Sequence, residues 1–250
     1  MNKTASGNYA ANRRARSDIS VFDPDYAILS ELVPQLRELA RGGPATILDF
    51  GSGNAPYKHL FRNSTYVAAD VAQNSAGEID LILDGLPLPF EDESVDLVLC
   101  IYVLEHIQNY ADILKEFHRI LRKDGRLFIA TPFIYREHEA PNDFHRPTVF
   151  SLASDLSMFG KAEMRKVGNG WFTLYTLANE LHIKQGERPE SSGIGRWFRA
   201  GFNRAILPIL NLTIFTKPSH TEDTSYHTLF ALATKVAPNL ASKDSLKTMF

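Results

Sequence analysis

Three acidic residues stand at the ends of short apolar runs, where they could bind one ligand together. Asp49 precedes Gly51 and Gly53 in a glycine-rich turn, and Asp70 and Asp84 end the next two apolar runs. In an open α/β sheet, ligands bind at the carboxyl ends of parallel strands, and glycines let backbone amides approach them. Asp49 would attract a cationic group, Asp70 could accept hydrogen bonds from both hydroxyls of a ribose, and Asp84 could accept one from an amino group.

The glycine turn differs from the turn that binds dinucleotides. That fingerprint has a third glycine at the position where this chain has Pro56. A carboxylate at Asp49 would also repel a pyrophosphate. The turn therefore favours a ligand with a cationic group over a dinucleotide.

Strands and helices alternate along the part of the chain that carries these acids. We expect strands over about 46–50, 66–70, 79–83, 95–101 and 126–131, followed by two more at 162–167 and 228–235. Apolar residues at helical spacing predict helices from Asp23 to Gly42, over 110–121 and over 147–159. This alternation predicts an α/β fold with a mostly parallel sheet.

Five motifs in this order resemble the class I S-adenosylmethionine (SAM)-dependent methyltransferases, in particular the type 11 family. They are Leu48–Gly53, Asp70, the segment from Leu86 to Val98, Leu104-Glu105-His106 and Leu121–Leu127. The resemblance covers about residues 45 to 160 and departs from the family at Ala55, where many members have glycine. It implies a Rossmann-like, mostly parallel seven-stranded sheet with helices on both faces, an antiparallel last strand, and SAM as cofactor.

The resemblance also assigns roles to residues along the predicted sheet edge. The predicted cofactor-binding residues are Asp49, Gly51, Gly53, Asp70, Val71, Asp84, Gly85 and Cys100. Tyr135, Asp143 and Arg146 are predicted to bind the acceptor, the last two within a Pro-x-Asp-x-x-Arg pattern of the family. An ion pair between Asp143 and Arg146 that only shapes the loop is the alternative interpretation.

His106 and His145 are the candidate catalytic residues. Methyl transfer needs a nucleophile aligned with the methyl group, and a hydroxyl acceptor also needs a base that removes its proton. His145 follows the fifth predicted strand, where an acceptor would lie, and His106 follows the fourth. The alternative role of His106 is to cap the next helix or to bond a backbone group of the cofactor loop.

Two other kinds of chemistry are disfavoured. The loop after the fifth strand has metal-ligand residue types, including His138 and Glu139, but the two-histidine helical zinc spacing is absent and Pro141 would interrupt a helix, so we expect no required metal. Cys100 lies in an apolar strand without the proline context of a nucleophilic cysteine, which favours a buried thiol. The Asp/Asn-Pro-Pro-aromatic signature of amino-directed DNA methyltransferases is also absent after the fourth strand.

Composition and the remaining segments limit the partners. With 250 residues, a net charge of −2 and a single cysteine, the chain fits one domain, no nucleic-acid partner and a reducing, cytoplasmic location. We expect a mobile arm over 1–22, a single domain over 23–250 and a helical insertion at about 170–218. Within it, aromatic residues and arginines over 193–218 are typical of either a packed insertion or a helix in peripheral contact with a membrane.

The sequence thus predicts a SAM-dependent methyltransferase. Its acceptor is expected to be a hydroxyl of a small molecule, a saccharide or a lipid-linked saccharide. A catalytically silent SAM-binding partner or regulatory subunit is the alternative, and the sequence does not indicate an oligomeric state.

Overall fold

Seven strands form one sheet in the computed structural model, which describes residues 19–22, 26–174, 176–177 and 224–236. The strands are β1 (Thr46–Phe50), β2 (Thr65–Asp70), β3 (Leu81–Ile82), β4 (Val95–Ile101), β5 (Leu121–Pro132), β6 (Gly160–Val167) and β7 (Thr228–Lys235). Their order is β3-β2-β1-β4-β5-β7-β6, with parallel pairing from β3 to β5. β7 runs antiparallel to both of its neighbours, which confirms the predicted sheet.

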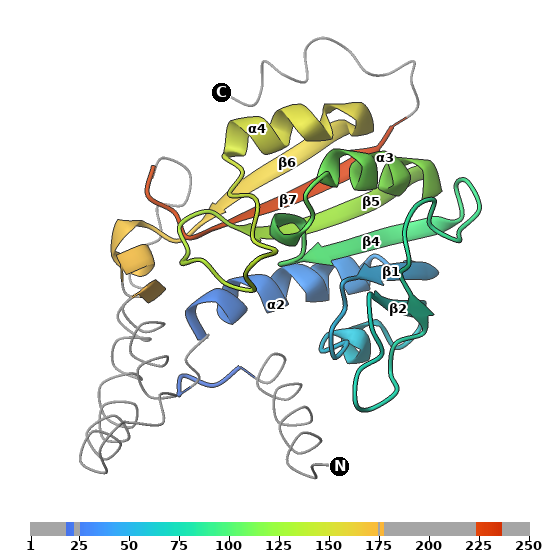
Figure 1. Ribbon diagram of the computed structural model, residues 1–250, viewed down its shortest axis with the longest axis horizontal. Helices are drawn as coiled ribbons and strands as arrows, with labels where there is room; N and C mark the ends of the chain where they lie inside the picture. Colours follow the sequence, from blue (N-terminus) through green and yellow to red (C-terminus); the bar gives the residue numbers. More distant parts are fainter. Residues whose placement is uncertain (1–18, 23–25, 175, 178–223, 237–250) are drawn as a thin grey trace.

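Helices cover both faces of this sheet (Figure 1). The helical elements are α2 (Tyr26–Arg41), η1 (Lys58–Phe61), η2 (Leu104–His106), α3 (Tyr110–Ile120), α4 (Val149–Asp155) and η3 (Leu156–Phe159). Figure 1 shows α2 on one face and α3 and α4 on the other. All three helices agree with the predicted ones, and α4 begins after Thr148, whose hydroxyl accepts a hydrogen bond from the Ser151 amide.

Alternating side chains of the central strands fill two cores. Leu48, Val98 and Leu127 pack with α3 and α4, whereas Ile47 and Leu97 pack with α2. Because successive side chains of a strand point to opposite faces, a sheet covered on both faces has almost continuously apolar strands. β4 is such a strand, since its first six residues are buried.

Leu121 is a residue predicted as helical that belongs to a strand. The helical spacing places it at the end of the predicted helix 110–121, but it is the first residue of β5 and pairs with Val95 across a register shift. Other boundaries differ by a few residues, since β3 is shorter than predicted and β6 begins at Gly160. β5 pairs with β4 at Leu121 and again from Arg126 onward. Between these two points Asp124 adopts a left-handed φ of 61°, so the chain departs there from regular strand geometry. The core position of Leu121 is the same in both elements.

Two parts of the predicted domain organisation, the arm and the insertion, lie mostly outside the described residues. The arm over 1–22 is described only from residue 19, and most of the insertion over 170–218, including the segment 193–218, lies outside the described residues. Among the helices that are described, none combines the length and apolar character needed to cross a membrane.

Candidate functional site

The glycine turn after β1 lies beside the end of β2. The amides of Gly51 and Ser52 both donate to the Ala69 carbonyl at 2.8 and 3.0 Å, and the Gly53 amide donates to Asp70 Oδ2 at 2.7 Å. Gly53 has a φ of 57° and no atom within 4 Å of the position that a Cβ would occupy. The turn therefore presents open space and backbone next to a carboxylate.

Gly51 connects the turn to the loop that follows β4. A Cβ on Gly51 would lie 2.4 Å from one methyl group of Val103, and φ at Gly51 is 70°. Both the contact and the left-handed backbone require glycine here. Ala55, the family departure noted above, is buried with a φ of 44°, so alanine takes the left-handed conformation that glycine adopts freely.

Asp49 lies beneath the turn and is buried. Its Oδ2 accepts a hydrogen bond from the Tyr66 hydroxyl. Burial raises the pKa of Asp49 to about 7, the Tyr66 hydrogen bond opposes this rise, and the negative charge of Asp70 adds to it. The Asp49 side chain therefore lies below the surface that the turn presents.

Asp70 and Asp84 lie beside exposed apolar side chains at the carboxyl ends of β2 and β3, and we call this surface the rim. Asp70 and Ile82 are paired across β2 and β3, and the Leu83 amide donates to the Asp70 carbonyl at 2.8 Å. Val71 is 75% exposed and Ile82 is 45% exposed. Asp84 follows within two residues of Ile82 and is exposed, and Gly85 next to it has a φ of 142°. Such a surface can bind a ligand whose aromatic ring packs on the apolar side chains and whose hydroxyl and amino groups donate hydrogen bonds to the two carboxylates.

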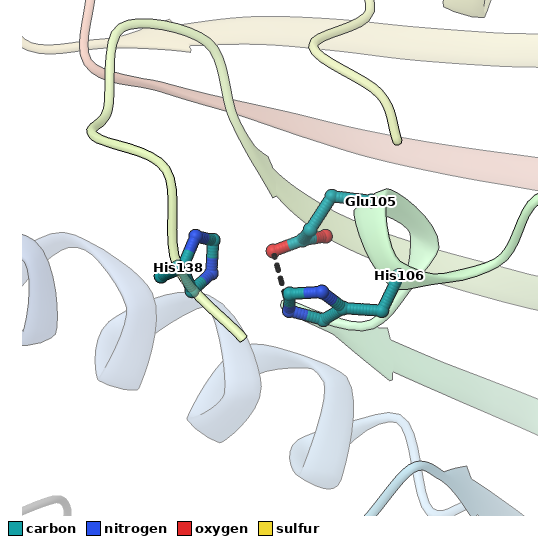
Figure 2. A group of neighbouring side chains, drawn as sticks. All are labelled: Glu105, His106 and His138. Atoms are coloured by element: carbon teal, nitrogen blue, oxygen red, sulfur yellow. Dashed lines mark ion pairs between the residues drawn. The ribbon is translucent and has the colours of Figure 1, made fainter. Parts of the chain in front are cut away.

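A cluster of three side chains lies where the loops after β4 and β5 meet (Figure 2). Glu105 and His106 belong to η2, and His138 belongs to the loop after β5. One ligand atom from each of the three lies within 4.8 Å of the others, and His106 Nε2 is 4.0 Å from Glu105 Oε1. The rings of His106 and His138 meet edge to face with centroids 4.8 Å apart.

Glu105 is completely buried in this cluster. Its Oε2 is 3.4 Å from the Thr131 hydroxyl, whereas its Oε1 has no hydrogen-bond partner. Its backbone carbonyl accepts hydrogen bonds from the amides of Phe144 and His145 at 2.8 and 3.3 Å, which joins the two loops. Burial raises the pKa of the Glu105 carboxyl above its usual range, although the neighbouring His106 and Arg146 charges oppose this.

An ion pair shapes the loop that carries His138. Arg146 donates to both carboxylate oxygens of Asp143, at 2.5 and 2.7 Å, and Asp143 also accepts from the His138 amide at 2.9 Å. These contacts hold the pKa of Asp143 well below its usual range. Tyr135 packs edge to face against His138, with ring centroids 5.1 Å apart. The Asp143 side chain is 4% exposed, which favours the loop-shaping interpretation of this pair over direct contact with an acceptor.

His145 lies apart from the cluster. Its Nε2 is 3.0 Å from the Gln108 carbonyl, which makes this nitrogen the donor, and its ring packs edge to face against Tyr110. His106 instead hydrogen bonds the Asn142 carbonyl through Nδ1 at 2.5 Å, so its Nε2 faces Glu105. Of the two candidate catalytic histidines, His106 is therefore better placed to act on a ligand in the cluster.

Cys100 is fully buried in the core on the α3 side of the sheet. Burial raises the pKa of its thiol far above its usual value, and the nearby carboxyls of Glu105 and Asp49 add to the effect. A thiol that remains protonated is a poor nucleophile. The structure therefore agrees with the expected buried thiol, and the side chain does not line the open part of the turn.

Sequence reasoning did not assign Glu105 and His138 to a common site. They are separated by 33 positions and belong to different loops, so no local spacing connects them. The available signal was topological, because β4 and β5 are parallel neighbours whose carboxyl ends lie side by side.

Comparisons with known proteins agree with this geometry. Residues 48–129 match a family model described as "Methyltransferase domain". The chain is 33% identical over 110 residues to the uncharacterized protein MJ0638 of Methanocaldococcus jannaschii, which covers 42% of this chain and 48% of that protein. It is 29% identical over 104 residues to the ubiquinone biosynthesis O-methyltransferase of Pseudomonas aeruginosa strain PAO1, covering 42% and 39% of the two chains. The chain thus spans less than half of the length of either relative.

Solved structures share the fold at low sequence identity. A phosphoethanolamine N-methyltransferase 2 of Haemonchus contortus in complex with S-adenosyl-L-methionine has a TM-score of 0.52 at 14% identity and covers 90% of this chain and 59% of its own. The [4+2]-cyclase SpnF has a TM-score of 0.51 at 16% identity and covers 83% and 82%. These similarities establish the fold.

We expect Gly51→Ala to destabilise the protein more than Gly53→Ala. Both variants force alanine into left-handed backbone, at a cost of about 1–2 kcal/mol, but only the Gly51 variant also collides with Val103. Thermal unfolding measures the difference, and a cost of 1 kcal/mol corresponds to roughly 2–4 °C in a chain of this size. Equal melting temperatures would contradict the close contact between the two loops.

We expect Asp49→Asn to become more stabilising, relative to the unaltered protein, as pH rises. Burial raises the pKa of Asp49 from 3.8 to about 7 in the folded protein. The contribution of this carboxyl to the free energy of unfolding is therefore largest below about pH 4, where it is protonated in both states, and it is lost as pH rises through about 7. The neutral amide has no such dependence. Melting temperatures of both ligand-free proteins at pH 5 and pH 8 measure the difference. His227, whose pKa burial lowers to about 4, titrates in both proteins and cancels in the comparison.

Proposed function

We propose that this chain, which belongs to the class I SAM-dependent methyltransferases, transfers a methyl group from SAM to an oxygen of its acceptor. The observation that carries the proposal is the meeting of a glycine turn, two strand-end carboxylates and a buried glutamate–histidine cluster at one edge of the sheet. Val103 connects the two halves, since it contacts Gly51 and lies two residues before Glu105.

The residues of the turn and the rim fit SAM. We propose that Asp70 accepts the ribose hydroxyls, that Val71 and Gly85 border the adenine, and that Asp84 accepts its amino group. Gly51 and Gly53 leave room for the amino-acid part of the cofactor, and the charge of Asp49 favours its cationic groups. SAM supplies the activated methyl group. Cys100 supports the floor of this site from the core and makes no direct contact.

The cluster fits an oxygen acceptor. Methyl transfer proceeds mainly by alignment of nucleophile and methyl group, but a hydroxyl also has to lose its proton. Glu105 and His106 present a carboxylate oxygen and a ring nitrogen to the same space, and these can orient and activate a hydroxyl. The similarity to a relative named as an O-methyltransferase supports the same choice. In this proposal His145, Asp143 and Arg146 hold the loop that covers the acceptor, and Tyr135 borders it.

Small molecules, saccharides and lipid-linked saccharides are the acceptor classes we propose. For a lipid-linked acceptor, residues 193–218 would provide the membrane contact, because arginine beside Trp197 and Phe198 suits a headgroup boundary. Sedimentation with anionic liposomes at low and high salt tests this part separately.

A catalytically silent SAM-binding protein is the second candidate. The fold alone does not decide between them, since a structure with similar topology is named as a [4+2]-cyclase. The buried cluster beside the turn supports turnover, because Glu105 Oε1 has no hydrogen-bond partner and faces the space where an acceptor would bind.

We expect S-adenosylhomocysteine to raise the melting temperature, whereas NAD at equal concentration does not, because a ligand that binds only the folded state stabilises it. Asp70→Ala should weaken this binding by roughly 1–3 kcal/mol, about 5- to 160-fold, through loss of charge-assisted hydrogen bonds. Asp112→Ala on α3 removes an exposed carboxylate that pairs with Lys115 and serves as the control. Equal stabilisation by NAD would refute the cofactor assignment.

We expect His106→Ala to lower turnover by about 10²-fold or more while S-adenosylhomocysteine affinity stays nearly unchanged. Release of S-adenosylhomocysteine over a panel of hydroxyl acceptors measures turnover. His145→Ala should have the smaller effect, because its ring is held by Gln108 and Tyr110. The reverse order would transfer the catalytic role to His145, and the absence of turnover on every acceptor would favour the silent SAM-binding protein.

A further inference from the structure

The cluster of Glu105, His106 and His138 has the composition of a metal site. It offers one carboxylate oxygen and two imidazole nitrogens within 4.8 Å of one another, from two loops that the sheet brings together (Figure 2). With metal–ligand distances of about 2.1 Å, tetrahedral ligand atoms lie roughly 3.4 Å apart. The observed spacing therefore requires only a modest inward movement of the three side chains.

The second ring nitrogen of each histidine lies beside a polar group. His106 Nδ1 donates to the Asn142 carbonyl at 2.5 Å, which leaves its Nε2 as the ligand atom. His138 Nδ1 lies 3.3 Å from Asp143 Oδ2 and 3.5 Å from Arg146 Nη2. Asp143 also accepts a hydrogen bond from the His138 amide, so it holds both the backbone and the ring of His138 in place.

Glu105 provides the independent observation. Its side chain is completely buried and its Oε1 has no hydrogen-bond partner, although the carboxylate faces two imidazoles. An unsatisfied buried carboxylate oxygen is costly, and a bound cation is a partner that removes this cost.

We propose that Glu105, His106 and His138 bind one divalent first-row transition-metal ion of the zinc class. Imidazole ligands favour such ions over Mg²⁺ and Ca²⁺, which prefer oxygen-only sites. Three protein ligands leave a coordination position open, as in catalytic rather than structural sites. The sequence predicts no required metal, because the histidine spacing of a zinc site on one helix is absent. The proposed site instead takes its ligands from two loops.

The metal site deepens the proposed function and rests on it for its role. An oxygen of the acceptor is expected to occupy the open position, and a hydroxyl bound to a divalent ion loses its proton more readily than a free one. His106 then serves as a ligand. The acceptors best suited to this arrangement are those with an acidic hydroxyl or with two neighbouring oxygens.

Cobalt binding tests the site without any acceptor. Untagged protein is treated with chelator, dialysed and titrated with Co²⁺, and visible absorption and calorimetry follow the binding. We expect one Co²⁺ per chain, displaced by Zn²⁺. Glu105→Gln, His106→Gln and His138→Gln should each weaken binding by more than 10-fold, and Asp143→Asn by about 10- to 100-fold, because Asp143 orients His138.

Two matched variants serve as controls. Glu137→Gln removes an exposed carboxylate next to His138, and His59→Gln removes a histidine of η1, on a different element from the cluster. Both should bind Co²⁺ as the unaltered protein does. Binding that is equal in all variants is adventitious and overturns the proposal, as does the absence of binding by the unaltered protein.

S-adenosylhomocysteine binding by the same samples separates this proposal from the proposed function. A variant that retains it is folded, so a loss of Co²⁺ binding there reports on the site. If Glu105→Gln fails to fold, the two histidine variants decide the question. Unaltered protein that binds S-adenosylhomocysteine but no Co²⁺ refutes only the metal site, whereas Co²⁺ binding without S-adenosylhomocysteine binding refutes only the proposed function.

Discussion

The buried Glu105 is the constraint on which the rest of the site depends. Its backbone carbonyl binds the amides of Phe144 and His145, and its carboxylate lies between Thr131 and the two histidines. The loop after β5 is therefore positioned by the loop after β4 and not by its own sequence alone. A buried carboxylate without full hydrogen bonding destabilises a fold, which is the physical reason for our proposal that Glu105 serves ligand binding.

Two carboxyl groups, Asp49 and Glu105, are buried at neighbouring strand ends, and burial raises the pKa of both. They differ in their partners. Asp49 accepts a hydrogen bond from Tyr66 and is sealed beneath the glycine turn, whereas Glu105 retains one oxygen without a hydrogen bond. The first arrangement places a carboxyl with a pKa raised to about 7 beneath the proposed cofactor site, and the second leaves a carboxylate oxygen free of hydrogen bonds. Both carboxyls lie at one sheet edge, and Val103, which packs against Gly51, lies two residues before Glu105.

The strands, the helices and the cofactor half of the site follow from local sequence. The apolar runs of β1, β2 and β4, the glycines at positions 51 and 53 and the acids at 49 and 70 are each visible within a few residues. The start of β5 at Leu121 was not predictable in this way, because pairing with Val95 across the sheet overrides the helical spacing. Nor was the tie between His145 and Gln108, which depends on where a long loop folds back.

The acceptor half of the site is a product of tertiary contacts. A spacing rule for metal-binding helices examines one element at a time, and the residues from Glu137 to Pro141 do not fit it. In a parallel sheet, metal ligands can also come from separate loops, because loops that are distant in sequence meet where neighbouring strands end. His138, which the ion pair of Asp143 and Arg146 holds near Glu105, therefore joins the cluster, whereas the His145 ring packs against Tyr110. In such a fold, tertiary contacts determine the shape of the loop at the acceptor site. The residues that bind the cofactor can therefore be predicted from local sequence, whereas those that bind the acceptor depend on how distant loops meet.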